Sequence, residues 1–542
     1  MKKSNIGTSP KGSKVKSATP LSVPVKDSHV RTSDVNRAEK SSGIVLTAAI
    51  IVAVLAVNVL LYVLASVFGL YLRPREKDIT VLSGATDALF AEAIETNKKV
   101  KITFFYSFNI QSDVSEHATG RYVHRTVKNF EERYPGLITV DYVNLVTRQS
   151  ELEGGRVSIE KYQNTDTPLS RFSVAFECEN RIKVVTDTVS KSAYADFYTL
   201  DSEEGAASSY DGEQFVASMI CRVIRDSDKK AYFTKSHSET LDPAFARLLT
   251  LAGYDYDVNG IELRKNTVPE DCDLLIISNP KTDFESGAVT SEIGKLEDYI
   301  RKGGNLMVML DPFTKKLNTL EGLLEKYGIS VSRSTLSDGR VVSDVVREDG
   351  VFGAGGSAVG TTDGYTFAAT FAGGDGIGGA IADKVKDISN ASVIVRTAGA
   401  LNLNGELGAK AILTSSKTSH CEMDGEITRD GGSFPIAAVS RRAAEIGSGE
   451  STVFVISGIY STATANLTSN GYANRDFYYA LLENAFGAEN MPYGFKMVLI
   501  SDTVAIEGLT MGMAKLYLTV SMIVPVSLAV IGTVIVIRRK NR

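Results

Sequence analysis

The chain has 542 residues, which is enough for two or three domains. Apolar residues make up 43% of it and charged residues 23%, which is ordinary for a folded protein. The net charge of -5 excludes a global basic field of the kind that points to nucleic-acid binding. The charge is uneven, because residues 1–40 hold nine Lys and Arg against three Asp and Glu, and residues 538–542 are basic again.

The amino-terminal end divides into a polar tail and an apolar stretch. Residues 1–42 are rich in Ser, Lys, Pro and Thr with few large apolar side chains, which predicts a disordered tail. Residues 43–72, GIVLTAAIIVAVLAVNVLLYVLASVFGLYL, carry no charge and exceed the roughly 20 apolar residues that span a bilayer. The stretch is too long for a signal peptide and no clean small-residue cleavage site follows it, so we predict a transmembrane helix rather than a cleaved leader or a buried helix.

A second apolar stretch lies near the other end. Residues 515–537 include LYLTVSMIVPVSLAVIGTVIVI, where Pro525 is tolerated better than in a soluble helix. The two basic tails, 1–42 and 538–542, are both expected in the cytoplasm by the positive-inside rule. We therefore predict a two-pass protein of the cell membrane with both termini cytoplasmic and residues 73–514 outside.

The first part of the external region, residues 73–228, alternates helix and strand patterns. A helix is expected over 79–96, a strand over 100–106, a helix over 119–134 and a strand over 137–146. This order predicts a parallel strand pair in an α/β domain.

Two short strands and a helix complete this first domain. Strands are expected over 171–176 and 181–186, joined at Glu179-Asn180, and a helix over 211–226. The order is that of a thioredoxin-like domain. The position after its first strand is Ser107-Phe108-Asn109-Ile110 rather than CxxC, so redox chemistry is not expected.

The cysteines give no sign of a metal site. None of them forms a CxxC, and no His or Cys stands at metal-ligand spacing. Disulfides are optional in domains of this size, and we expect mostly buried thiols at Cys178, Cys221, Cys272 and Cys421. No metal and no cofactor is predicted.

The second part, residues 229–514, has the pattern of a doubly wound α/β domain. The apolar runs DLLIIS and NLMVML, each closed by a turn, are typical of central parallel strands. Strands and helices alternate, with strands expected near 230, 254–258, 273–278 and 305–310, and helices over 242–252, 287–302 and 317–327.

Polar side chains follow the strands of this second domain. His237, Glu239, Asn279 and Asp311 come after successive strands, at the edge where open α/β sheets bind ligands. They are the predicted ligand-binding residues. A hydrolase would need a Gly-x-Ser-x-Gly elbow, and Asn279-Pro280-Lys281 is not one. We predict a structural or ligand-positioning role for His237 and no enzymatic activity.

Glycines gather in one stretch of the second domain. Residues 374–379 match G-x-G-x-x-G, within a region of eleven glycines between Gly350 and Gly379. A lone match is weak and no good strand precedes it, so a flexible loop is expected. The chain has no Walker A sequence, so it is not expected to hydrolyse ATP.

Three segments, YFTKSHSET, DCDLLIISNPKTDF and LEDYIRKGGNLMVMLDP, together resemble the GldG-like, gliding-motility-type auxiliary proteins of ABC transporters. Ser236 stands where that family usually has glycine before His237. Near the end, Asn474 and the helix expected from about Arg475 resemble the family's closing pattern, and the resemblance covers roughly residues 79–540. It implies a thioredoxin-like domain followed by a class I glutamine-amidotransferase-like domain without that enzyme's chemistry, with an ABC permease and ATPase as partners.

Two functions of different classes are open at this point. The first is a non-enzymatic, membrane-anchored auxiliary component of an ABC transporter that contacts the substrate or serves as a scaffold. The alternative is an extracytoplasmic ligand-binding or sensing module, for example for cell-envelope glycan, that acts without a transporter. The absence of Trp weighs slightly against glycan stacking.

Overall fold

The computed structural model divides the chain into two units, residues 1–74 with 506–542 and residues 75–505. It describes residues 75–76, 79–95, 97–107, 118–163, 168–186, 194–200, 207–257, 259–287, 291–348, 352–354, 357–359, 364–389, 391–499, 504–505, 532, 534–535 and 537–538. Among these, no helix is both long and apolar enough to cross a membrane. The predicted span 43–72 lies outside the described residues, as does nearly all of 515–537.

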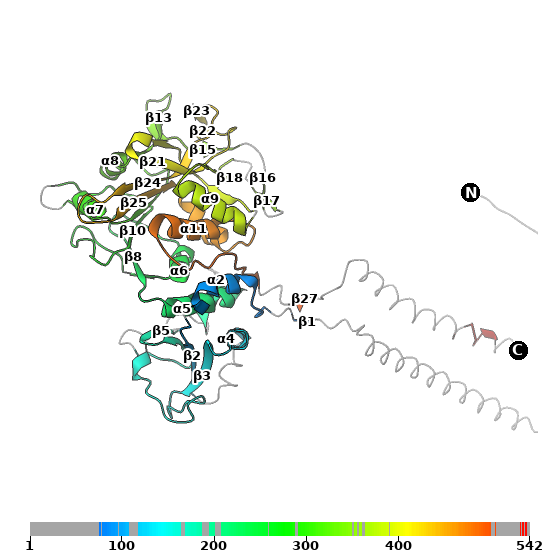
Figure 1. Cartoon of the computed structure of the whole chain (residues 1–542). Coiled ribbons are helices and arrows are strands. Elements are labelled where there is room, and N and C mark those ends of the chain that lie inside the picture. Colours follow the sequence, from blue (N-terminus) through cyan, green and yellow to red (C-terminus); the bar gives the residue numbers. More distant parts are fainter. Residues whose placement is uncertain are drawn as a thin grey trace, which may run out of the picture. The chain divides into compact units, whose positions relative to one another are not determined.

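The amino-terminal part of unit 2, residues 79–226, is called the N-lobe here. It contains a four-stranded sheet in the order β3-β2-β4-β5 (Figure 1). β2 and β3 are parallel, and β4 and β5 form an antiparallel hairpin that turns at Glu179 with a φ of 53°. Its elements are α2 (Gly84–Glu95), β2 (Val100–Tyr106), α4 (Ala118–Arg133), β3 (Ile138–Asn144), β4 (Val174–Cys178), β5 (Arg181–Val185) and α5 (Gly212–Ile224).

The predicted elements of the N-lobe are confirmed in their order, but two short strands over 198–200 and 207–210 were not predicted. Helix α4 forms because its apolar residues recur at helical spacing, and Val123, Val127 and Phe130 are all buried against the sheet. The 3₁₀ helices η1 (Glu160–Tyr162) and η2 (Ala195–Phe197) lie in the connections.

The rest of unit 2, residues 228–499, is called the C-lobe. Its nine-stranded sheet has the order β19-β18-β21-β24-β25-β11-β10-β8-β9. The strands are β8 (Lys229–Phe233), β9 (Tyr254–Tyr256), β10 (Leu274–Ser278), β11 (Leu306–Leu310), β18 (Thr366–Phe371), β19 (Val393–Arg396), β21 (Ala409–Thr414), β24 (Pro435–Ala443) and β25 (Glu450–Ser457).

Half of this sheet is parallel. Five neighbouring strands pair in parallel, in the order β25, β11, β10, β8 and β9. β8 is followed along the chain by β9, which lies on one side of β8, and then by β10, which lies on its other side. The order therefore reverses between β8 and β10, which makes the carboxyl ends of these strands the topological switch point.

Helices cover both faces of the sheet. β10 is buried on both faces, as predicted from its unbroken apolar run: Leu275 and Ile277 pack with α7 and α8, while Leu274 and Ile276 pack in the core that includes α6, α9 and α11. The helices are α6 (Pro243–Leu251), α7 (Glu292–Arg301), α8 (Asn318–Lys326), α9 (Ile377–Ile388), α10 (Thr464–Leu467) and α11 (Asn474–Phe486).

The other half of the sheet is antiparallel and was not predicted. The flexible loop expected at the Gly-rich motif 374–379 is wrong for residues 377–379, because α9 begins at Ile377. Residues 374–376 lie in the connection between β18 and α9, so a strand does precede the motif. A Cβ at Gly379 would overlap the carbonyl oxygen of Gly374, so this glycine allows a tight strand-to-helix turn. β18 and β19 are antiparallel, so the motif does not sit in the parallel βαβ unit of a dinucleotide site.

Short strands extend the two lobes. In the C-lobe, small ladders join β12 to β20, β13 to β14, β16 to β17, and β22 to β15 and β23. Their bounds are β12 (Ile329–Val331), β13 (Arg333–Thr335), β14 (Val341–Ser343), β15 (Val346–Arg347), β16 (Phe352–Ala354), β17 (Ser357–Val359), β20 (Leu401–Leu403), β22 (His420–Met423) and β23 (Glu426–Arg429), with η3 (Gly405–Leu407) and η4 (Ile459–Thr462).

Two further ladders involve the ends of unit 2. β7 pairs with β6 and β26, and β1 pairs antiparallel with β27, so that Arg75 lies opposite Ala505. The strands are β1 (Arg75–Glu76), β6 (Tyr198–Leu200), β7 (Ala207–Tyr210), β26 (Val498–Leu499) and β27 (Val504–Ala505). The β1–β27 ladder is called the stem below.

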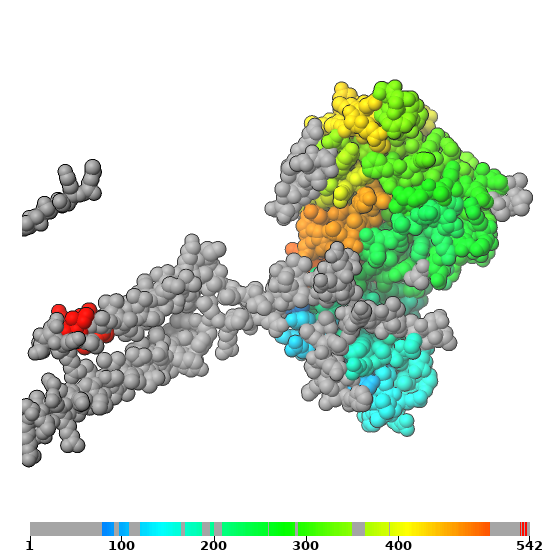
Figure 2. All heavy atoms as spheres, turned by 180° about the vertical axis from the view of Figure 1, so that it is seen from behind, coloured from blue at the N-terminus to red at the C-terminus, as the bar shows by residue number. Residues whose placement is uncertain are grey.

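One hydrophobic core runs through both lobes. Helix α5 is buried along almost its whole length, because it packs on the N-lobe sheet and also against α6 of the C-lobe. Figure 2 shows the N-lobe, coloured cyan, against the green residues of the C-lobe. Ion pairs also connect the two lobes. The carboxylate of Asp228, at the start of the C-lobe, forms salt bridges with three N-lobe residues, Arg181 (3.0 Å), Lys183 (2.6 Å) and Arg222 (3.4 Å).

Candidate functional site

The predicted ligand-binding residues all follow strands of the parallel half of the C-lobe sheet. His237 and Glu239 follow β8, Asn279 follows β10 and Asp311 follows β11. Since β8, β10 and β11 are adjacent and parallel, their carboxyl ends lie at one edge of the sheet, as predicted. This edge is called the carboxyl edge below.

His237 is buried at the carboxyl edge, with only 1% of its surface exposed. Its Nε2 atom lies 3.1 Å from Oε1 of Glu292, and its Nδ1 atom lies 3.4 Å from the hydroxyl of Thr282. The ring also stacks on Phe284, with 3.9 Å between ring centroids. Both ring nitrogens and one ring face are thus occupied by the protein itself, so the imidazole is positioned as part of the core.

The segment after β8 folds back over the end of β10. The backbone N–H of Thr240 donates to the carbonyl of Ser278 at 3.0 Å, and the Ser278 hydroxyl donates to the carbonyl of Thr240 at 2.6 Å. Ser236 and Ser238 have φ values of 103° and 58°, which the turn around His237 requires. Glycine adopts such angles most readily, so glycine at position 236 in the resembled family agrees with this backbone.

Glu239 and Asn279 belong to the same cluster. Oε2 of Glu239 accepts a 2.6 Å hydrogen bond from the backbone N–H of His237, and the Asn279 amide donates to the Thr240 hydroxyl at 2.8 Å. Glu239 Oε1 and Asn279 Oδ1 are buried and have no hydrogen-bond partner among the described residues. These two acceptors are the groups of the cluster that a bound water or ligand donor could satisfy.

Asp311 lies in a second cluster that touches the first through Lys281. Its Oδ2 accepts a 2.6 Å hydrogen bond from the Lys281 ammonium, and its Oδ1 accepts a 3.0 Å hydrogen bond from the backbone N–H of Phe313. The backbone N–H of Lys281 donates in turn to the carbonyl of His237 at 2.8 Å. The structure therefore brings His237, Glu239 and Asn279 together and places Asp311 in the neighbouring loop.

A small cavity lies beside Asp311 between the ends of β11 and β25. Its volume of about 10 Å³ fits one water molecule and no larger ligand. Among its lining residues, Ser457 is fully buried and its Oγ has no partner among the described residues, while Glu321 and Arg333 pair at 2.6 Å. The cavity is therefore suited to an ordered water rather than to a substrate.

Two exposed aromatic rings at the carboxyl edge were not predicted. Phe313 follows β11 and is 55% exposed, and Tyr460 follows β25 and is 44% exposed. Lys315 and Lys316, next to Phe313, are exposed as well. The only sequence signal was their position just after apolar strands, since nothing local distinguishes an exposed Phe from a core one.

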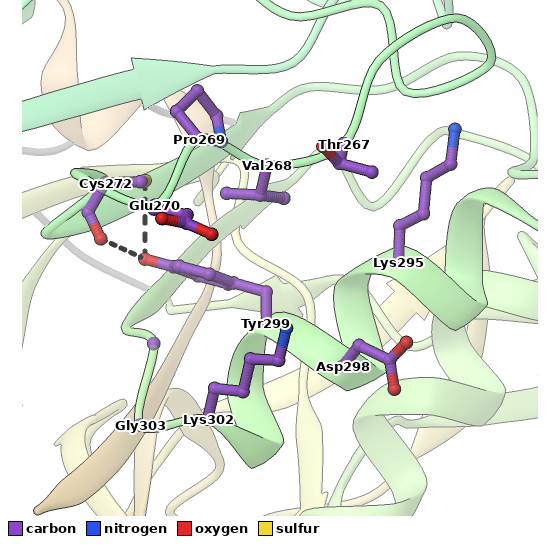
Figure 3. Close-up of a pocket in the computed structure, with 11 residues that line it drawn as sticks. Thr267, Val268, Pro269, Glu270, Cys272, Lys295, Asp298, Tyr299, Lys302 and Gly303 are labelled. Atoms are coloured by element: carbon purple, nitrogen blue, oxygen red, sulfur yellow. Dashed lines mark hydrogen bonds between the residues drawn. The ribbon is translucent and has the colours of Figure 1, made fainter. Parts of the chain in front are cut away.

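A larger cavity, of about 380 Å³, lies at the opposite edge of the sheet, at the amino ends of β10 and β11 (Figure 3). The ring of Tyr299 lines it, and the Tyr299 hydroxyl contacts both the thiol and the carbonyl oxygen of Cys272. Burial raises the pKa of the Cys272 thiol to about 12, which makes it unreactive at neutral pH. Figure 3 shows Lys295, Lys302 and Asp298 around this cavity.

All four cysteines are buried thiols, which confirms the prediction. Within the part of the chain that the structure describes, no group of three or more His, Cys, Asp or Glu side chains could hold a metal ion. The arrangement at the carboxyl edge is a set of hydrogen-bonded turns rather than a metal centre.

Residues 228–353 match the family described as "ABC-type uncharacterized transport system". The matched stretch begins just before β8 and ends in β16, so it contains the carboxyl edge and all four predicted site residues. The match indicates an auxiliary component of an ABC-type transport system. The search of curated proteins found no match.

Three solved structures illustrate the structural similarities that were found. The N-terminal domain of mmIFT52 is 15% identical over 47% of this chain and 97% of its own, with a TM-score of 0.34. A ThuA-like protein from Bacteroides uniformis is 10% identical over 48% of this chain and 93% of its own, with a TM-score of 0.27. PurLQS from Thermotoga maritima is 10% identical over 47% and 98%, with a TM-score of 0.25. At these TM-scores the similarities assign neither a fold nor a function to this chain.

Proposed function

We propose that the chain is a non-enzymatic, membrane-anchored auxiliary component of an ABC transporter. The observation that carries the proposal is the family match over residues 228–353, which covers the parallel strands β8, β9, β10 and β11 and the turns that follow β8, β10 and β11 at the carboxyl edge. The partners are an ABC permease and its ATPase, because the chain itself has no Walker A sequence.

The membrane anchoring in this proposal rests on the sequence. Residues 43–72 and 515–537 are each long and apolar enough to span a bilayer, and the tails beyond them are basic. Both termini are then cytoplasmic, and unit 2 lies outside the cell membrane. The stem agrees with this arrangement, because it pairs Arg75 with Ala505, the first and last residues of unit 2.

We also infer what each lobe corresponds to. The N-lobe order β3-β2-β4-β5, with α4 between its parallel strands and α5 at its end, supports a thioredoxin-like domain. The parallel half of the C-lobe sheet, with helices on both faces, supports a domain related to class I glutamine amidotransferases. The N-lobe lacks CxxC after β2, so it acts as a scaffold without redox chemistry.

The geometry around His237 supports the non-enzymatic part of the proposal. A general base must reach the proton that it abstracts, directly or through one water. His237 is buried, stacks on Phe284, and directs its Nε2 at the buried carboxylate of Glu292. Its role is to position the turn between β8 and α6.

Substrate contact at the carboxyl edge would fall to exposed side chains instead. Phe313 and Tyr460 present aromatic surface at the ends of the neighbouring strands β11 and β25. Exposed rings of this kind also favour the alternative, a ligand-binding or sensing module that acts without a transporter, because aromatic faces bind sugars and peptides readily. The presence or absence of a permease in the purified complex separates the two.

The test is purification of the full chain at native expression in mild detergent. We expect the permease and the ATPase to co-purify. Small residues in the second predicted span, Ser527 and Gly532 among them, allow close helix approach, so replacing both with Leu should weaken the association while unit 2 stays folded. A chain that elutes alone in several detergents would favour the sensing module.

A further inference from the structure

A groove of about 390 Å³ lies between the first helix of unit 2 and the helices of the C-lobe. One wall is the small-residue face of α2, with Ala85, Ala88, Leu89 and Ala91, and the other is formed by α9, α11 and the segment after α11, with Lys384, Ile388, Glu483, Asn490, Met491 and Tyr493. Resting on the proposed function, we propose that this groove receives an apolar segment of the permease that projects outside the bilayer.

The walls of the groove are held firmly. The carboxylate of Glu213 on α5 accepts hydrogen bonds from the hydroxyls of Ser83 (2.9 Å) and Thr86 (2.6 Å) at the start of α2. On the opposite wall, the Tyr493 hydroxyl donates to Glu483 at 2.7 Å. A preformed groove lowers the entropy cost of binding, which favours a stable docking site over a transient gap.

The chemistry of the groove selects an apolar occupant. Ala88 and Ala91 are exposed and small, so they leave room for a large side chain between the walls. The charged groups at the rim neutralise each other, since the Lys384 ammonium lies 3.7 Å from Glu483 and 4.8 Å from the centre of the Tyr493 ring. Lys384 and Glu483 are the charged residues among the described side chains that line the groove, and they pair with each other. An apolar helix or turn could bury one anchor residue between the walls, as helix-in-groove complexes do.

The position of the groove along the chain points to a partner in the membrane. α2 begins at Gly84, eight residues after Glu76 of the stem, which limits the separation to about 29 Å of extended chain. Tyr493, on the other wall, is eleven residues before Val504 of the stem, at most about 40 Å. Both walls are thus connected by short segments to the stem, where the chain enters and leaves unit 2. A bound permease would present its external loops to this part of the surface.

The experiment places a photo-crosslinking amino acid at position 88 of the full chain in native membranes, with position 443 as the matched control. Ala443 is also an exposed alanine, at the end of β24 and outside the groove. We expect a crosslink to the permease from position 88 and none from position 443. Ala91→Trp, which fills the groove, should reduce the crosslink from position 88 at least about tenfold, as expected for loss of a buried anchor.

The outcomes separate this inference from the proposed function. If the permease co-purifies but position 88 yields no crosslink, or crosslinks only a second copy of this chain, the groove is not the docking site and the proposed function stands. A crosslink from position 88 that persists unchanged in Ala91→Trp also overturns the inference. If no permease co-purifies with the unmodified chain, both are overturned.

Discussion

The Nε2 atom of His237 lies 3.1 Å from Oε1 of Glu292, and both side chains are buried at the carboxyl edge of the C-lobe sheet. Glu292 belongs to the first turn of α7, and its Oε2 accepts a 2.8 Å hydrogen bond from the N–H of Glu285. The pair therefore connects the turn after β8 to the start of α7. Both oxygens of the Glu292 carboxylate are thus hydrogen-bonded by the protein itself, without a substrate.

His237→Ala should lower the free energy of unfolding by about 1–3 kcal/mol, because it leaves one oxygen of a buried carboxylate without its partner. The measurement is denaturant unfolding of the full chain in detergent. The double variant with Glu292→Ala should cost less than the sum of the two single variants, since the partners lose the same interaction. Strictly additive losses, or a hydrolytic activity that disappears in His237→Ala, would contradict the positioning role.

Asp228 at the lobe junction should contribute more to the free energy of unfolding than its exposed neighbour Asp226. Asp228→Asn removes the charge that faces Arg181, Lys183 and Arg222, and should lower the free energy of unfolding by about 3 kcal/mol, as for a broken buried ion pair. Asp226→Asn is the matched control. Its side chain is 99% exposed and pairs with Lys98, so the substitution should change the free energy of unfolding by less than about 1 kcal/mol. Equal effects would show that the junction network does not hold the lobes together.

The contribution of Asp228 should depend on pH. Burial raises the pKa of this carboxyl, but the positive charges of Arg222, Lys183 and Arg181 outweigh it, so the net shift is downward. A carboxyl with a lowered folded pKa stabilises the protein above its unfolded pKa, and this stabilisation is lost as the pH falls through the folded pKa. The difference in the free energy of unfolding between the wild-type chain and Asp228→Asn should be largest at pH 7 and should shrink below about pH 4. A difference that grows with acidification would reverse the sign and refute the assignment.

The orientation in the membrane can be tested by thiol labelling. A membrane-impermeant maleimide should label Ala443→Cys in intact cells, because Ala443 is exposed on the predicted external unit. Native thiols should give little background, since all four are buried and burial raises the pKa of both Cys272 and Cys421 to about 12. Ser4→Cys in the amino-terminal tail should react only after lysis. The opposite pattern would place unit 2 in the cytoplasm.

Several elements could be predicted from the sequence because their signals are local. β10 is an unbroken apolar run, and α4 and α7 carry apolar residues at helical spacing. The meeting of strand ends at the carboxyl edge followed from parallel order alone. Local periodicity and turn residues were sufficient for these elements, with boundaries shifted by a few residues, as at α7, whose first residue is Glu292.

The remaining features depend on contacts between distant residues. The antiparallel half of the sheet is built from β18, β19, β21 and β24, whose short runs show their pairing only in three dimensions. Glu292 has the sequence context of a surface acid in a first helical turn, and its partner His237 is 55 residues away. Asn474 was identified in the sequence only through the family resemblance. In the structure its side chain accepts a 2.8 Å hydrogen bond from the backbone N–H of Ile394 and donates a 2.9 Å hydrogen bond to the carbonyl of Ser461.

The last prediction concerns the stem. Arg75 and Ala505 are directly opposed in the antiparallel ladder, and opposed residues in such ladders have Cα atoms about 4.5–5.5 Å apart, within the range that a disulfide can bridge. Arg75→Cys with Ala505→Cys should therefore form an intramolecular disulfide outside the cell. The bond would close a loop around all of unit 2, so the chain should run faster in a non-reducing gel and return to its normal position after reduction.

The control pairs Arg75→Cys with Ala443→Cys, which is exposed but not opposed to Arg75, and it should leave both thiols free. A disulfide in the first pair alone would hold the two predicted anchors close together. Only a few residues separate Arg75 from the first predicted span, and about ten separate Ala505 from the second. The anchors would then meet a permease as one pair of helices rather than as two independent ones. If the first pair forms only intermolecular dimers or stays reduced, the stem is not paired within one chain, and the anchors are free to bind the membrane partner separately.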